Sequence, residues 1–470
     1  MPVGFLSKLC EGLWNPWLLG LFLLAGGYFT LRSGFFQLFS LPTWLRETVG
    51  SLRREKGEAK GGLTQVQALS TALASTIGTG SIAGVATAIF FGGPGAVFWM
   101  WVSAFLGMMT GFVEKTLAVR YQEPDGEGGL WGGPMCYMSR GLKRIGKPLS
   151  AAFSFFCVLA SLGGGAMVQS NSIAAAVHAA VGTPELLCGV VTAALVGTVL
   201  FGGVSRVGKV SERLVPAMAL LFLAGGVWVI FAHREALPGA FRDIFTCALS
   251  PRAAAGGYAM TTAMRYGVAR GVFTNEAGLG SSAIAHAAAR AKHPAQEGFW
   301  GMFEVFTATL VVCTVTALVI LTSGVYDMTA ALGAIKSGTV PPEWVGAPLS
   351  GAAFGTVMGR LGPVFVAVCL LLFAFTSLLG WGYYGERGLS YLLGNDRGRL
   401  PFRLLFLGAV VLGSMGEAAA VWQLSDLLNG LMALPNLAAL LLLAPQALAL
   451  LPTGSGGRSP GGAGPLPRRR

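Results

Sequence analysis

The sequence predicts an all-α integral membrane protein with about eleven transmembrane helices, and three observations support this fold class. Hydrophobic residues make up 53% of the 470 positions and charged residues only 11%, with a mean hydropathy of +0.64. Soluble chains carry about 25% charged residues. Apolar stretches long enough to cross about 30 Å of hydrocarbon recur along the chain, and Lys and Arg are concentrated in alternate loops. The composition therefore indicates a protein that is solvated mainly by lipid.

The predicted spans are long apolar stretches separated by loops that hold most of the charged residues. They cover residues 14–31, 66–92, 95–119, 149–178, 186–204, 211–232, 255–290, 298–323, 362–384, 402–416 and 425–451. The stretch at 402–416 is short for a span. The stretch at 255–290 is too long for one straight helix, so we expect its beginning to lie at the membrane interface.

The distribution of positive charge predicts how these spans are oriented. Of the 33 Lys and Arg residues, the large majority lie in the loops that alternate spans place on the same side as the C-terminus. Because cytoplasmic loops are enriched in Lys and Arg, we expect the N-terminus outside and the C-terminus in the cytoplasm. The net charge of +12 is then an orientation signal, and no nucleic-acid partner is expected. The seven cysteines form no C-x-x-C motif and are interpreted as small core residues.

Two of the apolar stretches contain residues that break a helix. The first is TALASTIGTGSIAGVATAI, residues 71–89, whose centre reads G-T-G-S. The second is GVARGVFTNEAGLGSSAIAHAAA, residues 267–289, where Asn275 and Glu276 lie between glycine-containing halves. The breaks fall in the second and seventh spans. The two broken spans are therefore five spans apart. Because five is an odd number, the two halves of the chain cross the membrane in opposite directions, which is the arrangement of an inverted repeat.

This arrangement divides the chain into four parts. Residues 1–65 hold an N-terminal transmembrane helix and a cytoplasmic loop, and residues 66–232 form the first repeat. Residues 233–451 form the second repeat. Residues 452–470 are a tail rich in Gly and Pro that ends in three arginines, and we expect this tail to be disordered.

Each helix break exposes backbone groups that a ligand can satisfy. A half-helix that begins near Gly80 presents free N–H groups, which suit a carboxylate. A half-helix that ends near Ile77 presents carbonyl groups, which suit a cation or an ammonium group. Together they describe a site for an amino-acid zwitterion and a sodium ion. The alternative is that the glycines serve close helix packing, but packing does not explain Asn275 and Glu276, because carboxylates inside the membrane are rare and usually functional.

Other polar residues in the spans admit two interpretations each. Glu114 is either a gate or ion-pair residue or an interfacial charge that reaches toward water, and no partner can be named for Glu304. Thr376 and Ser377 either bind a ligand or return hydrogen bonds to their own helix. Trp381 follows them by about one turn and could line a pocket. The four histidines have no spacing typical of a metal site.

Four segments of the sequence closely resemble the alanine or glycine:cation symporter family of bacteria and archaea. They are GTGSIAGVATAIFFGGPGAVFWMWVSAFLGMMTGFVEKTLAVRYQ, GGPMCYM, GVARGVFTNEAGLGSSAIAHAAA and FAFTSLLGWGYYGERG. The resemblance runs from about residue 71 to residue 387. It implies a fold similar to the sodium-coupled leucine-transporter architecture of two inverted five-helix repeats, here preceded by one extra helix, in a multi-pass protein of the bacterial inner membrane.

The resemblance also implies roles for individual residues. It places Thr79 and Gly80 at the break whose amides hold a substrate carboxylate, and Phe273 and Thr274 at the second break, beside the substrate and its ammonium group. The implied sodium ligands are the carbonyls of Ala74 and Ile77 and the hydroxyls of Thr376 and Ser377. The complete set of substrate-binding candidates is Thr76, Thr79, Gly80, Phe273, Thr274, Asn275, Glu276 and Trp381.

One position departs from the family pattern. The family usually carries Asn where this chain has Ser81. The shorter hydroxyl reaches less far toward an ion shared with Thr274 and Asn275, so we expect a single sodium ion per transport cycle although Ser81 is kept as a candidate ligand.

The predicted function is import of a small neutral amino acid, alanine or glycine, coupled to sodium, by a monomer that is not an enzyme. The alternatives are a proton-coupled amino-acid symporter or exchanger, a channel, or an intramembrane enzyme. A channel is expected to have a ring of like residues around a pore, and the sequence has no H-E-x-x-H motif or phosphate-binding loop of the kind that enzymes and pumps use.

Overall fold

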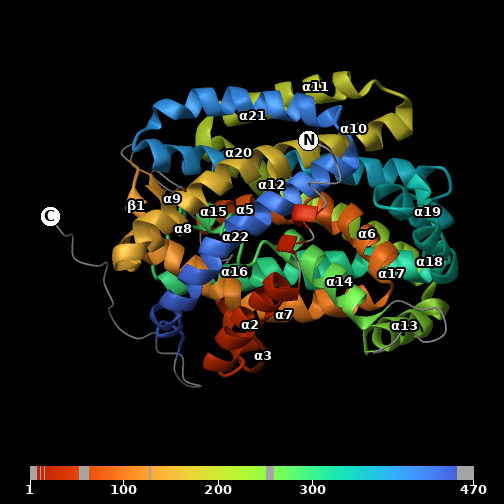
Figure 1. Ribbon diagram of the computed structural model, residues 1–470, viewed down its shortest axis with the longest axis horizontal. Coiled ribbons are helices and arrows are strands. Elements are labelled where there is room, and N and C mark those ends of the chain that lie inside the picture. The colour runs from red at the N-terminus through yellow and green to blue at the C-terminus, as the bar shows by residue number, and fades with distance from the viewer. Residues whose placement is uncertain are drawn as a thin grey trace.

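The computed structural model describes residues 8–10, 12–14, 16–51, 63–125, 129–249 and 259–452. Helices dominate these residues (Figure 1). The membrane-spanning set is α2 (Pro16–Arg32), α5 (Gln65–Thr76), α6 (Ala83–Gly92), α7 (Gly95–Arg120), α9 (Lys143–Ala160), α10 (Val168–Val181), α11 (Glu185–Leu200), α12 (Gly203–Ala232), α14 (Met260–Asn275), α15 (Ala283–His286), α16 (Pro294–Val305), α17 (Thr314–Thr322), α20 (Leu361–Leu393), α21 (Arg399–Ser414) and α22 (Ala418–Leu448).

The predicted fold class is confirmed, and each of the eleven predicted spans has a counterpart. Six helical segments of the described residues are long and apolar enough to cross a membrane: Gly95–Arg120, Lys143–His178, Gly203–Ala232, Pro294–Thr322, Leu361–Leu393 and Ala418–Leu448. The other spans correspond to α2, the pair α5 and α6, α11, the pair α14 and α15, and α21. Residues 250–258 and 453–470 lie outside the described residues, and with them the predicted interfacial start of the seventh span and the predicted tail.

Two spans contain a turn of wider helix. The segment η2 (Ser161–Met167) joins α9 to α10, and η5 (Phe306–Cys313) joins α16 to α17, both with π-helical hydrogen bonding. The first contains the three consecutive glycines 163–165. A side chain at position 165 would place its Cβ 2.5 Å from Trp381 Cβ, so Gly165 allows close packing against α20. π-Helical turns of this kind often occur at functional sites.

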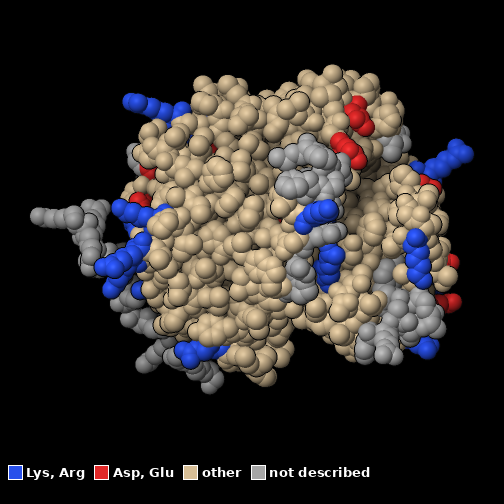
Figure 2. Space-filling model, viewed as in Figure 1, with Lys and Arg blue, Asp and Glu red and all other residues tan. Residues whose placement is uncertain are grey.

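Loops predicted for opposite sides of the membrane lie at opposite ends of the molecule. The segment with β1 (Glu123–Pro124), β2 (Leu130–Trp131) and α8 (Pro134–Gly141) lies at the left end in Figure 1. The outer-loop helices α13 (Leu237–Leu249), α18 (Met328–Ser337) and α19 (Ala347–Met358) lie at the right end. Figure 2 shows Lys and Arg at both ends of the molecule, and the area between the left end and the centre of the view carries few charges. The separation of the loops is consistent with the predicted alternation of the spans.

The remaining elements are short and were not predicted from the apolar pattern. They are the helices α3 (Phe36–Phe39) and α4 (Leu41–Glu47) after the first span and the single turns η3 (Arg234–Ala236), η6 (Pro342–Trp344) and η7 (Asp396–Gly398). The helices α8, α13, α18 and α19 were also missed, because they are too short to register as spans.

The first predicted helix break lies between α5 and α6. A capping box, in which Thr64 and Gln67 exchange side-chain and backbone hydrogen bonds, starts α5. The helix ends at Thr76, after which Gly78 is extended and residues 79–81 form the single turn η1. A side chain at position 78 would place its Cβ 2.6 Å from Ser377 Oγ, so glycine permits the close approach of α20 to this turn.

The second predicted break lies between α14 and α15. The helix α14 ends at Asn275, and Glu276 follows in the left-handed conformation with a φ of 53°, which is uncommon for a residue other than glycine. Gly278 and Gly280 also have positive φ values, of 91° and 89°, which glycine adopts without strain. The chain therefore crosses the middle of this span without regular helical hydrogen bonds.

The half-helices pack in pairs across the two breaks. The first half of the first broken helix, α5, packs against the second half of the second, α15, and α6 packs against α14. At one end Leu63 forms a β-bridge with Ala289, in which Leu63 donates to Ala288 O and Arg290 donates to Leu63 O. This crossed pairing is the arrangement expected of two repeats in opposite orientation.

The helices α7 and α16 cross with their backbones in contact. A Cβ at Gly301 would lie 2.8 Å from Gly111 O and 2.8 Å from Lys115 Cδ, and a Cβ at Gly111 would lie 2.9 Å from Gly301 O. Small residues at such crossings are common in membrane proteins, because packing rather than the hydrophobic effect drives helix association there.

We predict that Gly301→Ala lowers the melting temperature of the purified protein by several degrees, because the added methyl group has no space between the two backbones. The matched control is Gly408→Ala in α21, where a Cβ meets no atom within 4 Å. Melting curves in detergent measure both variants. Equal melting temperatures for Gly301→Ala and the control would contradict the crossing described here.

Candidate functional site

A small cavity lies between the two helix breaks. The space that it encloses is about 10 Å³, which is roughly what one water molecule needs, so its walls must move apart to admit a larger ligand. It is lined by Ser75, Thr76, Gly78, Gly80, Gly164, Gln169, Phe273, Thr274, Glu276, Trp381 and Asn429. Of the eight predicted substrate-binding residues, all but Thr79 and Asn275 line this cavity.

One wall of the cavity is the backbone of the first break. Thr79 N donates to Gln169 Oε1 over 3.5 Å, which is the outer limit of a hydrogen bond. Gln169 also donates from Nε2 to Gly164 O. A Cβ at Gly80 would lie 2.9 Å from Thr274 Oγ1 and 3.1 Å from the ring of Phe273, so glycine keeps this wall open. The long contact to Thr79 leaves its N–H group available to a stronger acceptor.

A carboxylate lies at the opposite wall. Glu276 is 1% exposed and accepts hydrogen bonds at Oε2 from Ser281 Oγ (2.5 Å) and, more weakly, Ser75 Oγ (3.5 Å). Ser75 Oγ also lies 2.9 Å from Tyr384 Oη, on α20. The side chain of Glu276 thus connects the two broken helices to each other. The cavity therefore has N–H groups on one side and a carboxylate on another.

Aromatic rings and an ion pair cover the cavity on the side of α14. The ring of Phe273 packs against that of Trp422, with centroids 5.4 Å apart. Arg270, one turn earlier on α14, lies 5.7 Å from the Phe273 ring and 5.1 Å from the Trp422 ring. Its guanidinium makes a bidentate pair with Asp426 of α22, at 3.2 and 2.9 Å. Such fork-shaped pairs are geometrically specific, so this cover holds α14 against α22.

The predicted sodium residues of α5 and α20 lie together. Ser377 Oγ donates to Ala74 O over 2.9 Å and lies 3.4 Å from Ser75 O, and Thr376 Oγ1 lies 3.4 Å from Ala74 O. Thr376 also returns hydrogen bonds to Leu372 O and Phe373 O of its own helix. Ile77 caps α5 in the same turn. The interpretation that the hydroxyls return hydrogen bonds to their own helix thus applies to Thr376, whereas Ser377 donates to the end of α5.

The residues of the second candidate ion site are only partly brought together. The hydroxyls of Ser81 and Thr274 both lie beside the Cys313 thiol. Ser81 O accepts a hydrogen bond from Thr316 Oγ1 at 2.8 Å. Asn275 points away, because its side chain lines a different small cavity and accepts from Ala277 N. The number of sodium ions per transport cycle therefore stays a prediction.

The interpretation of Glu114 as an interfacial charge is wrong. Glu114 and Lys115 are both fully buried, and Lys115 Nζ donates to Glu114 Oε2 over 2.9 Å. Asn436 of α22 donates to the other Glu114 oxygen over 2.7 Å. Glu304, for which the sequence offered no partner, lies 3.5 Å from Lys115 Nζ and 3.3 Å from His286 Nε2. No cluster of metal-ligating residues occurs in the described part of the chain.

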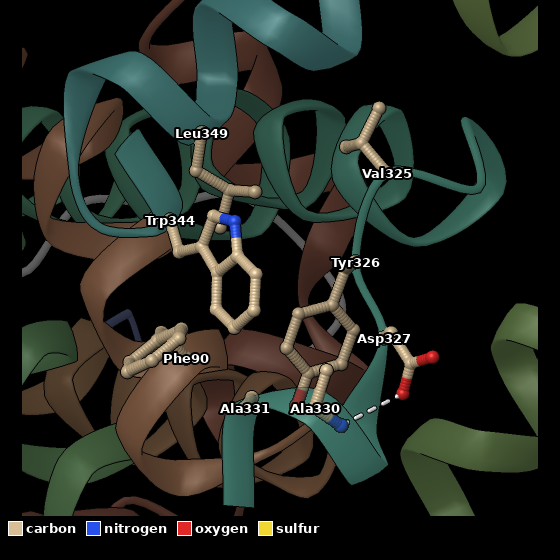
Figure 3. A pocket seen from close by; sticks show the side chains of 8 residues that line it. All are labelled: Phe90, Val325, Tyr326, Asp327, Ala330, Ala331, Trp344 and Leu349. Carbon is tan, nitrogen blue, oxygen red and sulfur yellow. Dashed lines mark hydrogen bonds between the residues drawn. The ribbon is translucent and has the colours of Figure 1, made fainter. Parts of the chain in front are cut away.

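A second pocket lies at the end of the molecule that carries α18 and α19. It is lined by Phe90, Val325, Tyr326, Asp327, Ala330, Ala331, Trp344 and Leu349 (Figure 3). Asp327 caps α18 by accepting from Thr329 N and Ala330 N, so its charge serves the helix start. The pocket lies at the C-terminal end of α6 and shares no lining residue with the cavity between the breaks.

Three residues that line the cavity between the breaks were missed by sequence reasoning. Gly164 lies in the π-helical turn η2, Gln169 in α10 and Asn429 in α22. Asn429 Oδ1 is buried and has no hydrogen-bond partner within the described ranges. The available signal was a Gln or Asn side chain inside a predicted span, which is costly to bury unless it has a partner.

A membrane protein with two broken helices around a central cavity is a secondary transporter. The chain belongs to the sodium:alanine symporter family, whose model matches residues 3–453. The sequence resemblance is therefore confirmed, and so is the expectation that the chain is a transporter and not an enzyme.

Two relatives and one solved structure illustrate these similarities. The chain is 41% identical to the sodium/alanine symporter AgcS of Methanococcus maripaludis over 94% of each chain. It is 38% identical to the "Probable sodium/glutamine symporter GlnT" of Bacillus subtilis, over 92% of this chain and 86% of that one. A manganese transporter variant of Eremococcus coleocola has a TM-score of 0.53 at 15% identity, over 84% of this chain and 81% of that chain. This last similarity concerns the fold alone.

We predict that Asp426→Asn opens the cover over the cavity, because it removes the charge that fixes Arg270. The probe is a cysteine introduced as Thr76→Cys. In the Asp426→Asn background this cysteine should react several-fold faster with a small membrane-impermeant thiol reagent than in the protein with the intact Arg270–Asp426 pair. Asp327→Asn, which removes a carboxylate from the distant pocket, is the control and leaves the rate unchanged. A rate that is the same for Asp426→Asn and Asp327→Asn would show that the pair does not close the cavity.

Proposed function

We propose that the protein imports a small neutral amino acid, alanine, together with one sodium ion. The observation that carries the proposal is the cavity between the two breaks, which has backbone N–H groups on one wall and the Glu276 carboxylate on another. An amino-acid zwitterion carries both complementary charges. Membership of the sodium:alanine symporter family supports the same conclusion.

The substrate carboxylate would bind at the first break. There it accepts hydrogen bonds from the amides of Thr79 and Gly80 and displaces the long contact from Thr79 N to Gln169 Oε1. A charged acceptor forms a shorter and stronger hydrogen bond than an amide oxygen does. The ammonium group would face Glu276 and the free Asn429 Oδ1. Both charges of the zwitterion are then paired in a site from which water is largely excluded.

The walls of the cavity favour a short side chain. Phe273 and Trp381 are bulky, and a Cβ added at Gly80 would lie 2.9 Å from Thr274 Oγ1 and 3.1 Å from the Phe273 ring. Because the walls are this close together, a substrate with a methyl side chain requires only a small displacement of the rings, whereas a longer side chain such as that of glutamine requires a larger one, at a cost in packing. We therefore infer alanine or glycine as the substrate rather than glutamine.

The sodium ion would bind where α5 meets α20. Sodium prefers oxygen ligands, and Ala74 O, Ile77 O and the hydroxyls of Thr376 and Ser377 supply them without a full negative charge. Because Ser75 and Thr76 connect this site directly to the substrate cavity, an ion bound at Ala74 fixes the end of α5 in the position that the substrate needs. This shared segment couples the two binding events.

Transport would proceed by alternating exposure of this cavity. On the outer side the cavity is covered by Phe273 and the Arg270–Asp426 pair, and on the inner side by the contact of α5 with α15, including the Leu63–Ala289 bridge. Opening one cover at a time moves the substrate across the membrane. We further propose that the protein is a monomer of the bacterial inner membrane, with its N-terminus outside and its C-terminus inside.

The proposal predicts that Gly80→Ala abolishes alanine uptake, because its Cβ would lie 2.9 Å from Thr274 Oγ1 and fill the carboxylate position. Gly84→Ala, about one turn after Gly80 at the start of α6, is the matched control, since its Cβ meets nothing closer than 3.9 Å. The measurement is uptake of labelled alanine into proteoliposomes under an inward sodium gradient, compared with potassium. The proposal would be overturned if Gly80→Ala took up alanine at the rate of the control, or if the wild type took up alanine equally fast with sodium and with potassium.

A second prediction concerns the ion site. Ser377→Ala removes one oxygen that contacts Ala74, so the sodium concentration for half-maximal uptake should rise at least several-fold while the preference for alanine over larger amino acids is kept. Ser323→Ala is the control, because that hydroxyl only donates to Ile320 O of its own helix. Unchanged sodium dependence in Ser377→Ala would place the ion elsewhere.

A further inference from the structure

A buried histidine lies between two carboxylates at the inner half of the second broken helix. His286 Nδ1 lies 2.6 Å from Glu297 Oε2, and His286 Nε2 lies 3.3 Å from Glu304 Oε2. All three side chains are fully buried. We infer that this triad is a binding site for one proton, separate from the sodium and alanine sites, and that the proton holds α15 against α16.

The hydrogen-bond geometry requires the proton. A neutral imidazole has one N–H donor and one acceptor nitrogen, and an ionised carboxylate only accepts. With both ring nitrogens facing carboxylate oxygens, a neutral ring between two carboxylates would set one pair of acceptors against each other at hydrogen-bond distance. One additional proton removes this conflict, either on the ring or on one carboxyl group. The triad as a whole therefore holds one proton more than a neutral histidine and two carboxylates do.

The charge around the triad leads to the same conclusion. The second oxygens of Glu297 and Glu304, both Oε1, are buried and have no hydrogen-bond partner in the described part of the chain. Lys115 is the cation that faces Glu304, and Glu114 already pairs with it at 2.9 Å. Glu276 is the next carboxyl group along the same helix break and interacts electrostatically with Glu304. Without the proton, this region would bury an excess of carboxylates, which is costly.

In the described part of the chain, the contacts of α20 and α22 near the triad are made by neutral side chains. The helix α22 contributes the neutral Asn436, which bonds to Glu114 and to Tyr137 of α8. The helix α20 contributes Tyr384, which bonds to Ser75. Lys115 is therefore the cation of α7 that faces the triad, and His286 is the titratable group of α15 itself.

The position of the triad gives the proton a role in transport. His286 is the last residue of α15, which packs against α5 and ends three residues before the Leu63–Ala289 bridge. Glu297 and Glu304 belong to α16, which is packed tightly against α7. A protonated triad joins α15 to α16 and so favours the closed inner side. Loss of the proton breaks one of the two hydrogen bonds and releases α15. This role rests on the proposed function, but the proton site itself does not.

The first test needs no transport. Above about pH 6.5 an unfolded histidine is mostly neutral, so a proton retained by the folded triad stabilises the fold until rising pH removes it. We expect the melting temperature of the wild type to fall by several degrees between about pH 7 and about pH 9. Glu297→Gln supplies an amide donor to His286 without an added proton, so its melting temperature should change much less over this range. The control is Glu235→Gln, which alters an exposed carboxylate and should follow the wild type.

His286→Gln removes the titratable ring and provides a second variant if Glu297→Gln does not fold; it should also lose the pH dependence. In proteoliposomes, sodium-driven alanine uptake by the wild type should change with internal pH more steeply than uptake by either variant. Melting profiles of Glu297→Gln and His286→Gln that parallel that of Glu235→Gln would overturn the proton site. Absence of alanine uptake in the wild type, with the melting profiles as expected, would instead refute the proposed function and leave the site in place.

Discussion

The structure depends on one constraint: backbone N–H and C=O groups inside a membrane must find partners, and two helices leave theirs open. At residues 77–82 and 276–282 the chain abandons regular helix within a span. In lipid each unsatisfied backbone group costs several kcal/mol. Such breaks persist only where protein, water or a ligand meets these groups, and here both breaks open onto the same cavity. The arrangement of the surrounding helices follows from the need to enclose this cavity.

Small residues and one carboxylate make the enclosure possible. Gly78 lets α20 approach the first break, and Gly111 and Gly301 let α7 and α16 cross with their backbones in contact. Glu276 then bridges the two breaks through Ser281 and Ser75. Two groups of buried hydrogen bonds and ion pairs stabilise these polar residues in an apolar interior: Glu276 with Ser281 and Ser75 at the cavity, and the Glu114–Lys115 pair with Glu304 and the His286 triad beyond it.

The spans, both breaks and most of the cavity wall could be predicted from the sequence, because each depends on local signals. Apolar length predicts spans, and glycines beside Asn275 and Glu276 predict a break. Gln169 and Asn429 could not be assigned, since their helices read as regular spans and only the packing of α10 and α22 brings these side chains to the breaks. The partners of Glu304 were likewise hidden, because Lys115 reaches it only through the crossing of α7 and α16, and His286 reaches it only because the chain turns back between α15 and α16.

The central claim is that sodium and alanine bind to one shared segment, the end of α5 at the first break. Titration calorimetry of the purified protein tests it most directly, by measuring the alanine dissociation constant at several sodium concentrations and the sodium constant with and without alanine. Linkage requires that each ligand increases the affinity for the other by the same factor. The account predicts an increase of tenfold or more in both directions. Alanine binding of equal strength in sodium and in potassium would contradict it.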